Sequence, residues 1–276
     1  MEDLDLDYRA VQRLLLPSAI TLSTEEWLHS WLTPCCPSLK VPLLRLWDSY
    51  SGSQPGERNN MESRDPNKRL DTAESRIKSL TTHINHATWE PTPYISFTSS
   101  PQAITELASL RNHRNRGPHT LTAIHPGIRR SKQLPILDVE AEMNHYNIPD
   151  PYRRSKEYYK GHYVCIWKVT EAEIVGHWSW DALNQNPDWY DDIVLPAFEQ
   201  FGSQRPNDMS YDFSLSNAMA NLSVVDNRYT KNDDDSDNHS EGLPCYWETG
   251  SSWDTDDEVE EANRSDDIIK IIEGDW

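Results

Sequence analysis

The stretch Val41-Pro-Leu-Leu-Arg-Leu-Trp47 is apolar except for one charge, Arg45. A short apolar run of this kind predicts a buried strand. An arginine inside such a strand is costly unless its guanidinium is paired. A second run, Tyr94-Ile-Ser-Phe-Thr-Ser-Ser100, alternates like a strand and leads into Pro101 to Leu110. A proline start followed by apolar residues at helical spacing predicts a helix there.

Further short runs with strand character follow along the chain. They are Leu121–His125, Pro135–Val139, Tyr163–Trp167 and Glu173–Trp178. Because strands and helices do not alternate in βαβ order, this pattern predicts an α+β or mostly β architecture rather than a doubly wound sheet. Residues 51–78 are rich in glycine, proline, asparagine and charge, and they predict a long loop with a helix at its end.

The negative charge of the chain is concentrated near its end. The formal net charge is -19 over 276 residues, and Asp226 to Trp276 alone holds 17 acidic and 4 basic residues. Acidic blocks of this kind repel themselves and usually stay disordered. We therefore expect an N-terminal helical extension over residues 1–40, a folded domain over 41–225, and a largely disordered acidic tail over 226–276.

The N-terminal extension carries its own helix signal. Ser23-Thr-Glu-Glu26 has the pattern of a capping box and precedes Trp27-Leu-His-Ser-Trp-Leu32. The two tryptophans are four residues apart, so we expect them on one face of a short amphipathic helix that packs on the folded domain.

Composition excludes several classes of protein. Neither the folded part nor the tail has the basic excess that phosphate-dominated nucleic-acid binding requires. The longest apolar runs are far too short to span a membrane, and the acidic residues after Met1 are the opposite of a signal-peptide start. We expect an intracellular protein, cytoplasmic or nuclear, that binds neither nucleic acid nor membrane.

No metal site is expected either. The four cysteines lack Cys-x-x-Cys spacing, so we interpret them as reduced thiols. His83-Ile-Asn-His86 could place two imidazoles on one helical face, but the third ligand of a catalytic zinc site is missing.

Three groups of residues, taken in order, resemble the ADP-ribosyltransferase superfamily in the branch of the enterotoxin A subunits. They are Arg45 with Asp48-Ser49, the run Tyr94 to Ser99 before a helix, and Glu157 before Tyr158-Tyr159. The segment ending in Gly176-His-Trp178 is similar to an Ile-x-Gly-Trp stretch of that family, with one residue inserted. The chain also looks like a fungal family of intracellular proteins with this toxin-like domain. The resemblance spans roughly Val41 to Trp180 and implies a split β-sheet core with flanking helices.

The resemblance also implies chemistry on NAD. Glu157 would be the catalytic carboxylate, which hydrogen-bonds the ribose and stabilises the oxocarbenium-like sugar as nicotinamide leaves. Ser96 would orient this carboxylate and the ribose, and the planar fork of Arg45 would grip the pyrophosphate of NAD. The resemblance assigns these further residues to the NAD-binding side: Asp48, Tyr94, Thr98 and Ser99.

The register of the motifs leaves alternatives open. An extra Phe97 separates Ser96 from Thr98, so either hydroxyl could be the equivalent of the family serine. The stretch after Glu157 is longer than in the toxins, which makes Glu171 or Glu173 a fallback for the catalytic carboxylate. Nicotinamide could stack on Tyr94, Tyr158 or Tyr159.

The acceptor and even the activity have alternatives. Ser155 stands where arginine-modifying members carry a second acidic residue, so arginine is not the expected acceptor. The acceptor would be a protein, another nucleophile, or water in NAD hydrolysis. The second hypothesis is a catalytically inert interaction protein of the same fold, which recruits partners through its acidic tail. In that case Arg45 pairs with a neighbour such as Asp48, and Ser96 to Ser100 are an ordinary strand end that caps the helix.

Overall fold

The computed structural model describes residues 6–17, 24–32, 39–56, 58–85, 88, 90–152 and 159–205. Glu157, His86, Ser155, Tyr158 and the predicted tail over 226–276 lie outside the described residues.

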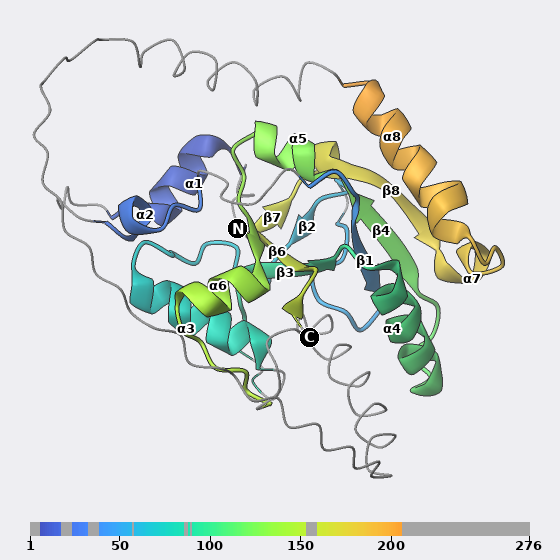
Figure 1. Ribbon diagram of the computed structural model, residues 1–276, viewed down its shortest axis with the longest axis horizontal. Coiled ribbons are helices and arrows are strands. Elements are labelled where there is room, and N and C mark those ends of the chain that lie inside the picture. The colour runs from blue at the N-terminus through green and yellow to red at the C-terminus, as the bar shows by residue number, and fades with distance from the viewer. Residues whose placement is uncertain are drawn as a thin grey trace, which may run out of the picture.

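A six-stranded sheet forms the centre of the molecule, and its neighbouring strands pair antiparallel (Figure 1). The strand order is β5-β6-β3-β1-β4-β8. These strands are β1 (Leu43–Trp47), β3 (Tyr94–Thr98), β4 (Thr120–Ile124), β5 (Ile136–Asp138), β6 (His162–Ile166) and β8 (Ile174–Ser179). A separate two-stranded ribbon pairs β2 (Met61–Glu62) with β7 (Lys168–Val169). Each strand of the large sheet overlaps one predicted run, so the predicted strands and the α+β class are confirmed.

Helices flank the sheet on both sides. The α-helices are α1 (Tyr8–Leu15), α2 (Glu25–Leu28), α3 (Ala73–Ile84), α4 (Pro101–His113), α5 (Pro126–Ser131), α6 (Val139–His145), α7 (Trp180–Leu183) and α8 (Leu195–Ser203). A 3₁₀ turn, η2 (Glu171–Glu173), precedes β8, and a π turn, η3 (Tyr190–Val194), leads into α8. Figure 1 shows α3 and α6 to the left of the sheet and α4, α7 and α8 to its right.

Local sequence explains where the two longest helices begin. Ser100 accepts a hydrogen bond from the Ala103 amide and is followed by proline, so α4 starts where the sequence predicted it. The helix at the end of the 51–78 loop is α3, which begins at Ala73 behind a capping box of Thr72 and Ser75.

The N-terminal segment differs from the prediction. Helix α2 ends at Leu28 because the carboxylate of Glu26 accepts hydrogen bonds from the Ser30 hydroxyl and the Leu32 amide, which turns the chain. Trp27 is therefore 84% exposed, whereas Trp31 is 4% exposed. The expectation that both tryptophans share one helical face is wrong.

A buried arginine joins this segment to the rest of the fold. Arg76 of α3 is fully buried and donates to the Leu70 carbonyl at 2.9 Å, to the His29 carbonyl at 2.7 Å and to the Glu26 carboxylate at 2.5 Å. Its guanidinium also lies 4.0 Å from the ring centroid of Trp31. Residues of α1 and Trp31 consequently share a hydrophobic core with α3 and α6.

The pairing between β1 and β3 is much shorter than the pairing of either strand with its other neighbour. β1 pairs with β3 only at Leu44 and Thr98, whereas β1 pairs with β4, and β3 with β6, over five residue pairs each. Part of the core is divided in a related way, since Leu44 and Leu46 pack with α4 and α7 while Tyr94 packs with α3 and α6. A third core cluster bridges the two strands, because Leu43 packs with Ile95 and Phe97. β1 and β3, which carry Arg45 and Ser96, are thus joined by side-chain packing more than by strand pairing.

Candidate functional site

The side chain of Arg45 bridges β1 and β3, which pair as strands only at Leu44 and Thr98. Its side chain is only 1% exposed, and its guanidinium donates from Nη1 to the Ser96 carbonyl at 3.1 Å and from Nη2 to the Gly52 carbonyl at 2.7 Å. These bonds compensate part of the cost of burying the charge. Arg45 therefore ties β1 to β3 and to the loop that follows β1.

Asp48, one residue beyond β1, is held by two arginines of the α4 region. Its Oδ2 lies 2.8 Å from Arg116 Nε and 3.7 Å from Arg111 Nη1, and its Oδ1 accepts a hydrogen bond from Arg116 Nη2 at 2.9 Å. Burial alone would raise the pKa of Asp48, but the charge of Arg111 and the hydrogen bond from Arg116 outweigh it and lower the pKa below its ordinary value. Asp48 is an ionised anchor between β1 and the end of α4.

Ser96 of β3 presents its two polar groups to different partners. Its carbonyl accepts from Arg45, while its hydroxyl lies 2.9 Å from Nε2 of His83 on α3. Nδ1 of the same imidazole lies 2.8 Å from the Thr92 hydroxyl. Tyr94 packs against His83 with ring centroids 5.1 Å apart, and it is fully buried, so burial raises the pKa of its phenol. In this arrangement Tyr94 has no open ring face for a ligand.

Thr98 and Ser99 meet the chain segment that enters β6. The Gly161 carbonyl accepts from the Ser99 amide at 2.9 Å, and the Thr98 hydroxyl lies 3.3 Å from the same oxygen. Gly161 has φ +77, and a Cβ there would lie 3.1 Å from the Ser99 hydroxyl, so glycine suits this close approach. Glu157 precedes Gly161 by four residues.

His162 opens β6 directly opposite Thr98 in the ladder. It is buried, and burial lowers its pKa to about 4, so the imidazole is neutral near pH 7.

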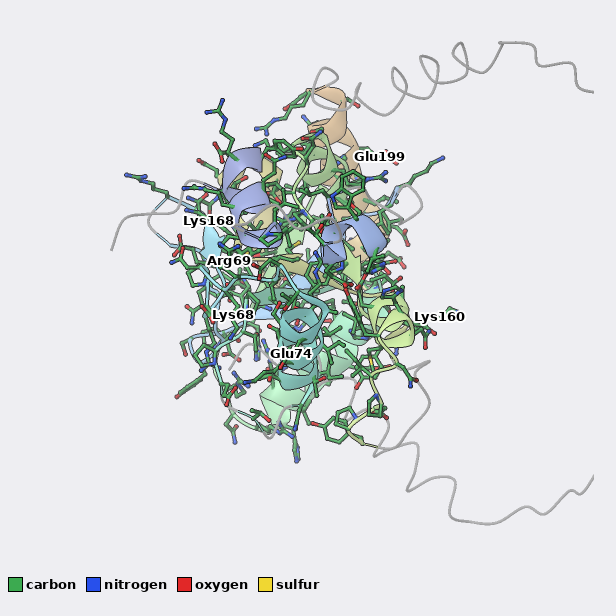
Figure 2. All side chains as sticks on the ribbon, turned by 90° about the vertical axis from the view of Figure 1, so that its left-hand side faces the viewer. Lys68, Arg69, Glu74, Lys160, Lys168 and Glu199 are labelled. Atoms are coloured by element: carbon green, nitrogen blue, oxygen red, sulfur yellow. The ribbon has the colours of Figure 1, made fainter. Side chains whose placement is uncertain are left out.

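β6 runs across the molecule between Lys160 and Lys168, which lie on opposite sides of the view in Figure 2. The contacts of Thr98 and Ser99 are therefore at the Lys160 end of β6.

Glu171 and Glu173, the two alternatives to Glu157 as the catalytic carboxylate, occupy different environments. Glu173 is completely buried and forms an ion pair with Arg129 at 2.7 Å. Its other oxygen accepts from the amide and hydroxyl of Thr170. Arg129 in turn donates to main-chain carbonyls of Pro135, Ile166 and Lys168. Glu173 thus joins η2 to the ends of β5 and β6, whereas Glu171 is exposed.

The Gly176-His-Trp178 motif has a packing explanation. The indole of Trp178 lies over Gly176 so closely that a Cβ there would be 2.8 Å from Cη2 of the ring. Between them, His177 bonds through Nδ1 to the Thr122 hydroxyl at 2.7 Å and through Nε2 to the Asn59 amide oxygen at 2.8 Å. Burial lowers the pKa of His177. The motif fixes β8 to β4 and to the loop before β2.

Two polar cavities lie beside the β2–β7 ribbon. Their volumes are about 510 Å³ and about 460 Å³, and they share Arg58, Asn60 and Lys168. Neither is lined by Arg45, Ser96 or Thr98. Within the part of the chain that the structure describes, no cluster of three metal-ligating side chains is found, and no helix has the length and apolar character to cross a membrane.

A family model described as a domain of unknown function, DUF7587, matches residues 42–183, which is just over half of the chain. The chain belongs to the DUF7587 family. The DUF7587 segment begins just before β1 and ends with α7, so it contains the whole six-stranded sheet and every predicted site residue. Comparison with the curated proteins and with the solved structures finds no match.

His83 was not expected from the sequence to be a partner of Ser96. In the sequence it stands out only together with His86, whereas the fold brings it from the last turn of α3 against β3. Arg111, Arg116 and Arg129 were not expected either, and each forms a buried ion pair inside the DUF7587 segment. These three arginines are buried in the fold, but in the sequence each is visible only as one more charged residue.

Proposed function

We propose that the DUF7587 segment of this chain acts on NAD as an ADP-ribosyltransferase-like enzyme, which transfers ADP-ribose to a protein or another nucleophile or hydrolyses NAD. One observation carries this proposal, namely that β1, β3 and β6 are neighbours in the sheet, since β1 and β3 carry two of the motifs and β6 follows the third in the sequence. Arg45 of β1 bonds the Ser96 carbonyl of β3, and Thr98 and Ser99 bond the Gly161 carbonyl, just after Glu157 in the chain. The order β6-β3-β1 puts the strand that follows Glu157 in the sequence next to the strands that carry Ser96 and Arg45.

The reaction would break the bond between ribose C1′ and the nicotinamide nitrogen. The electron pair of that bond leaves with nicotinamide and neutralises its positive nitrogen. The acceptor atom then bonds C1′ and releases its proton to solvent. Glu157 would supply the negative charge that stabilises the electron-poor sugar, and the hydroxyl of Ser96 would orient the reacting groups.

Arg45 fits a phosphate-binding role under one condition. Both of its Nη atoms donate to main-chain carbonyls, and one of these carbonyls, Gly52, belongs to the loop after β1. A phosphate oxygen would have to displace the Gly52 carbonyl. The exchange replaces a hydrogen bond to a neutral acceptor with one to an anion, which adds an ion pair and suits the planar fork of arginine. NAD binding would therefore move the loop after β1 while the bond to Ser96 stays in place.

Calorimetric titration tests the proposal. NAD added to the full chain is expected to bind saturably at one site, and Arg45→Lys is expected to weaken binding about tenfold because an ammonium cannot form the paired hydrogen bonds of a guanidinium. Arg69→Lys is the matched control, since Arg69 is exposed and bonds Asp71 and the Leu16 carbonyl. No heat with the wild type, or equal affinity in Arg45→Lys, would overturn the proposal.

The alternative is a catalytically inert interaction protein of the same fold. It is favoured by the extent to which candidate groups are already bonded inside the molecule: Asp48 lies between Arg111 and Arg116, and the Ser96 hydroxyl meets His83. In this case NAD gives no heat, and deleting residues 226–276 removes capture of a protein partner while the remaining chain still unfolds cooperatively.

A further inference from the structure

A short segment that precedes the DUF7587 segment docks on α3 and α6 through two side chains. Glu26 and Trp31 are 7% and 4% exposed, and Figure 1 shows α2, which contains Glu26, on the same side of the sheet as α3 and α6. The Glu26 carboxylate accepts from the Arg76 guanidinium of α3 at 2.5 Å. The Trp31 indole donates to the Glu142 carboxylate of α6 at 2.9 Å, and its ring centroid lies 4.0 Å from the Arg76 guanidinium carbon. We call Arg76 and Glu142, with the apolar side chains of α3 and α6 around Trp31, the docking surface.

The residues that make these contacts recur at the same spacing in the acidic tail. The pattern Glu-x-x-x-Ser-Trp occurs twice in the sequence, as Glu26 to Trp31 and as Glu248 to Trp253, which lies outside the described residues. The serine acts within the segment, because the Ser30 hydroxyl donates to the Glu26 carboxylate at 2.7 Å. The second copy therefore carries a carboxylate, a hydroxyl and an indole in the order in which the first copy uses them.

The two copies differ mainly at positions that contribute little to docking. Trp27 and Leu28 are 84% and 73% exposed, and threonine and glycine take their places in the second copy. The exception is His29, whose Nε2 lies 2.9 Å from the Glu142 carboxylate and whose place is taken by Ser251. We therefore expect the first copy to bind the docking surface more tightly than the second.

Charge and chain length both suit the second copy to the same surface. Arg76 forms its ion pair with Glu26, so an occupant that leaves has to be replaced by another carboxylate, because a buried guanidinium without a counter-charge is costly. Glu248 supplies such a carboxylate. About 40 residues separate Arg205 from Glu248, and even a helix of that length would be about 60 Å long, which is enough to cross a domain with a radius of gyration of about 16 Å.

We propose that the docking surface is a peptide-binding site with two alternative occupants, and that Glu248 to Trp253 of the same chain replaces Glu26 to Trp31 on it. The exchange ties the acidic tail to the DUF7587 segment and releases the segment that carries the exposed Trp27 and Leu28. This inference goes beyond the proposed NAD chemistry and does not depend on it.

Trp31→Ala in the full chain tests the exchange, because it removes the indole of the first copy and leaves the indole of the second. In this background, Trp253→Ala is expected to lower the midpoint of urea unfolding by roughly 1 M, since a buried tryptophan is lost. In the wild-type background, Trp253→Ala is expected to leave the midpoint unchanged. Trp247→Ala is the matched control, because it also removes an indole from the tail but glycine stands five residues before it. It should have no effect in either background.

A milder variant serves if Trp31→Ala does not fold. His29→Ser removes the one side-chain contact that the second copy lacks, so both copies then offer the same groups to the docking surface. In ¹H–¹⁵N spectra of this variant, the indole signal of Trp253, identified by its loss in Trp253→Phe, is expected at two positions. Their intensity ratio should not depend on protein concentration, because the exchange takes place within one chain.

Three results would overturn the proposal. One is an equal urea midpoint with and without Trp253→Ala in the Trp31→Ala background. Another is a single Trp253 indole signal in His29→Ser, at the position found in a free peptide of residues 246–255. The third is an intensity ratio that rises with protein concentration, because it would show that the tail of one copy binds another copy.

Discussion

Glu157→Gln is expected to slow nicotinamide release from NAD by about 10² to 10³-fold, the loss typical of removing one group that stabilises charge in a transition state. Glutamine keeps the size of the side chain but carries no negative charge to oppose the electron-poor ribose. NAD affinity is expected to change little, because the proposed phosphate contact belongs to Arg45. Single-turnover nicotinamide release, combined with calorimetry, separates the two effects.

Glu199→Gln is the matched control for this variant. Glu199 is exposed on α8, beyond the end of the DUF7587 segment at residue 183, and it lies in the upper part of the view in Figure 2. Its replacement removes one negative charge and should leave turnover unchanged. Undiminished turnover in Glu157→Gln would remove Glu157 from the catalytic role.

Glu173→Gln is expected to destabilise the fold by about 3 kcal/mol, the lower end of the range for breaking a buried ion pair by removing one partner. Glu173 and Arg129 are both completely buried, so the change leaves a buried guanidinium without its counter-charge. The main-chain carbonyls that Arg129 also bonds remain and limit the loss. Urea unfolding followed by fluorescence should show a lower midpoint at unchanged slope.

A partly exposed ion pair gives the comparison. Asp65 lies 3.4 Å from Lys68, and the two side chains are 32% and 41% exposed, respectively. Asp65→Asn is therefore expected to cost less than about 1 kcal/mol. If Glu173→Gln were as mild as this control, the Arg129–Glu173 pair would not have the structural role described above, and Glu173 would again be open as a functional carboxylate.

The large sheet was predictable because its strands are short apolar runs bounded by proline, glycine and polar residues. Leu44 and Leu46 in β1, and Ile95 and Phe97 in β3, are buried in the core as such runs require. The ribbon of β2 and β7 was not predictable, since two residues per strand carry no periodicity. Helix α2 was expected to be longer because the sequence does not show that the Glu26 side chain would bond Ser30 and Leu32.

The candidate site was predictable only in part. The motif residues Arg45, Ser96 and Thr98 were found because they sit inside recognisable strands, and the structure describes all of them. Their partners were not found, since His83 reaches Ser96 and Arg116 reaches Asp48 only through tertiary packing. A single sequence contains no signal that pairs residues so far apart along the chain.

Backbone amide chemical shifts of the full chain, recorded while NAD is added, test most directly whether NAD binds next to Arg45, between β1 and β3. If it does, the largest changes are expected at Arg45, Ser96 and Gly161 and in the loop containing Gly52, whose carbonyl NAD would displace. Changes centred on the cavities beside Lys168, or no changes at saturating NAD, would contradict it.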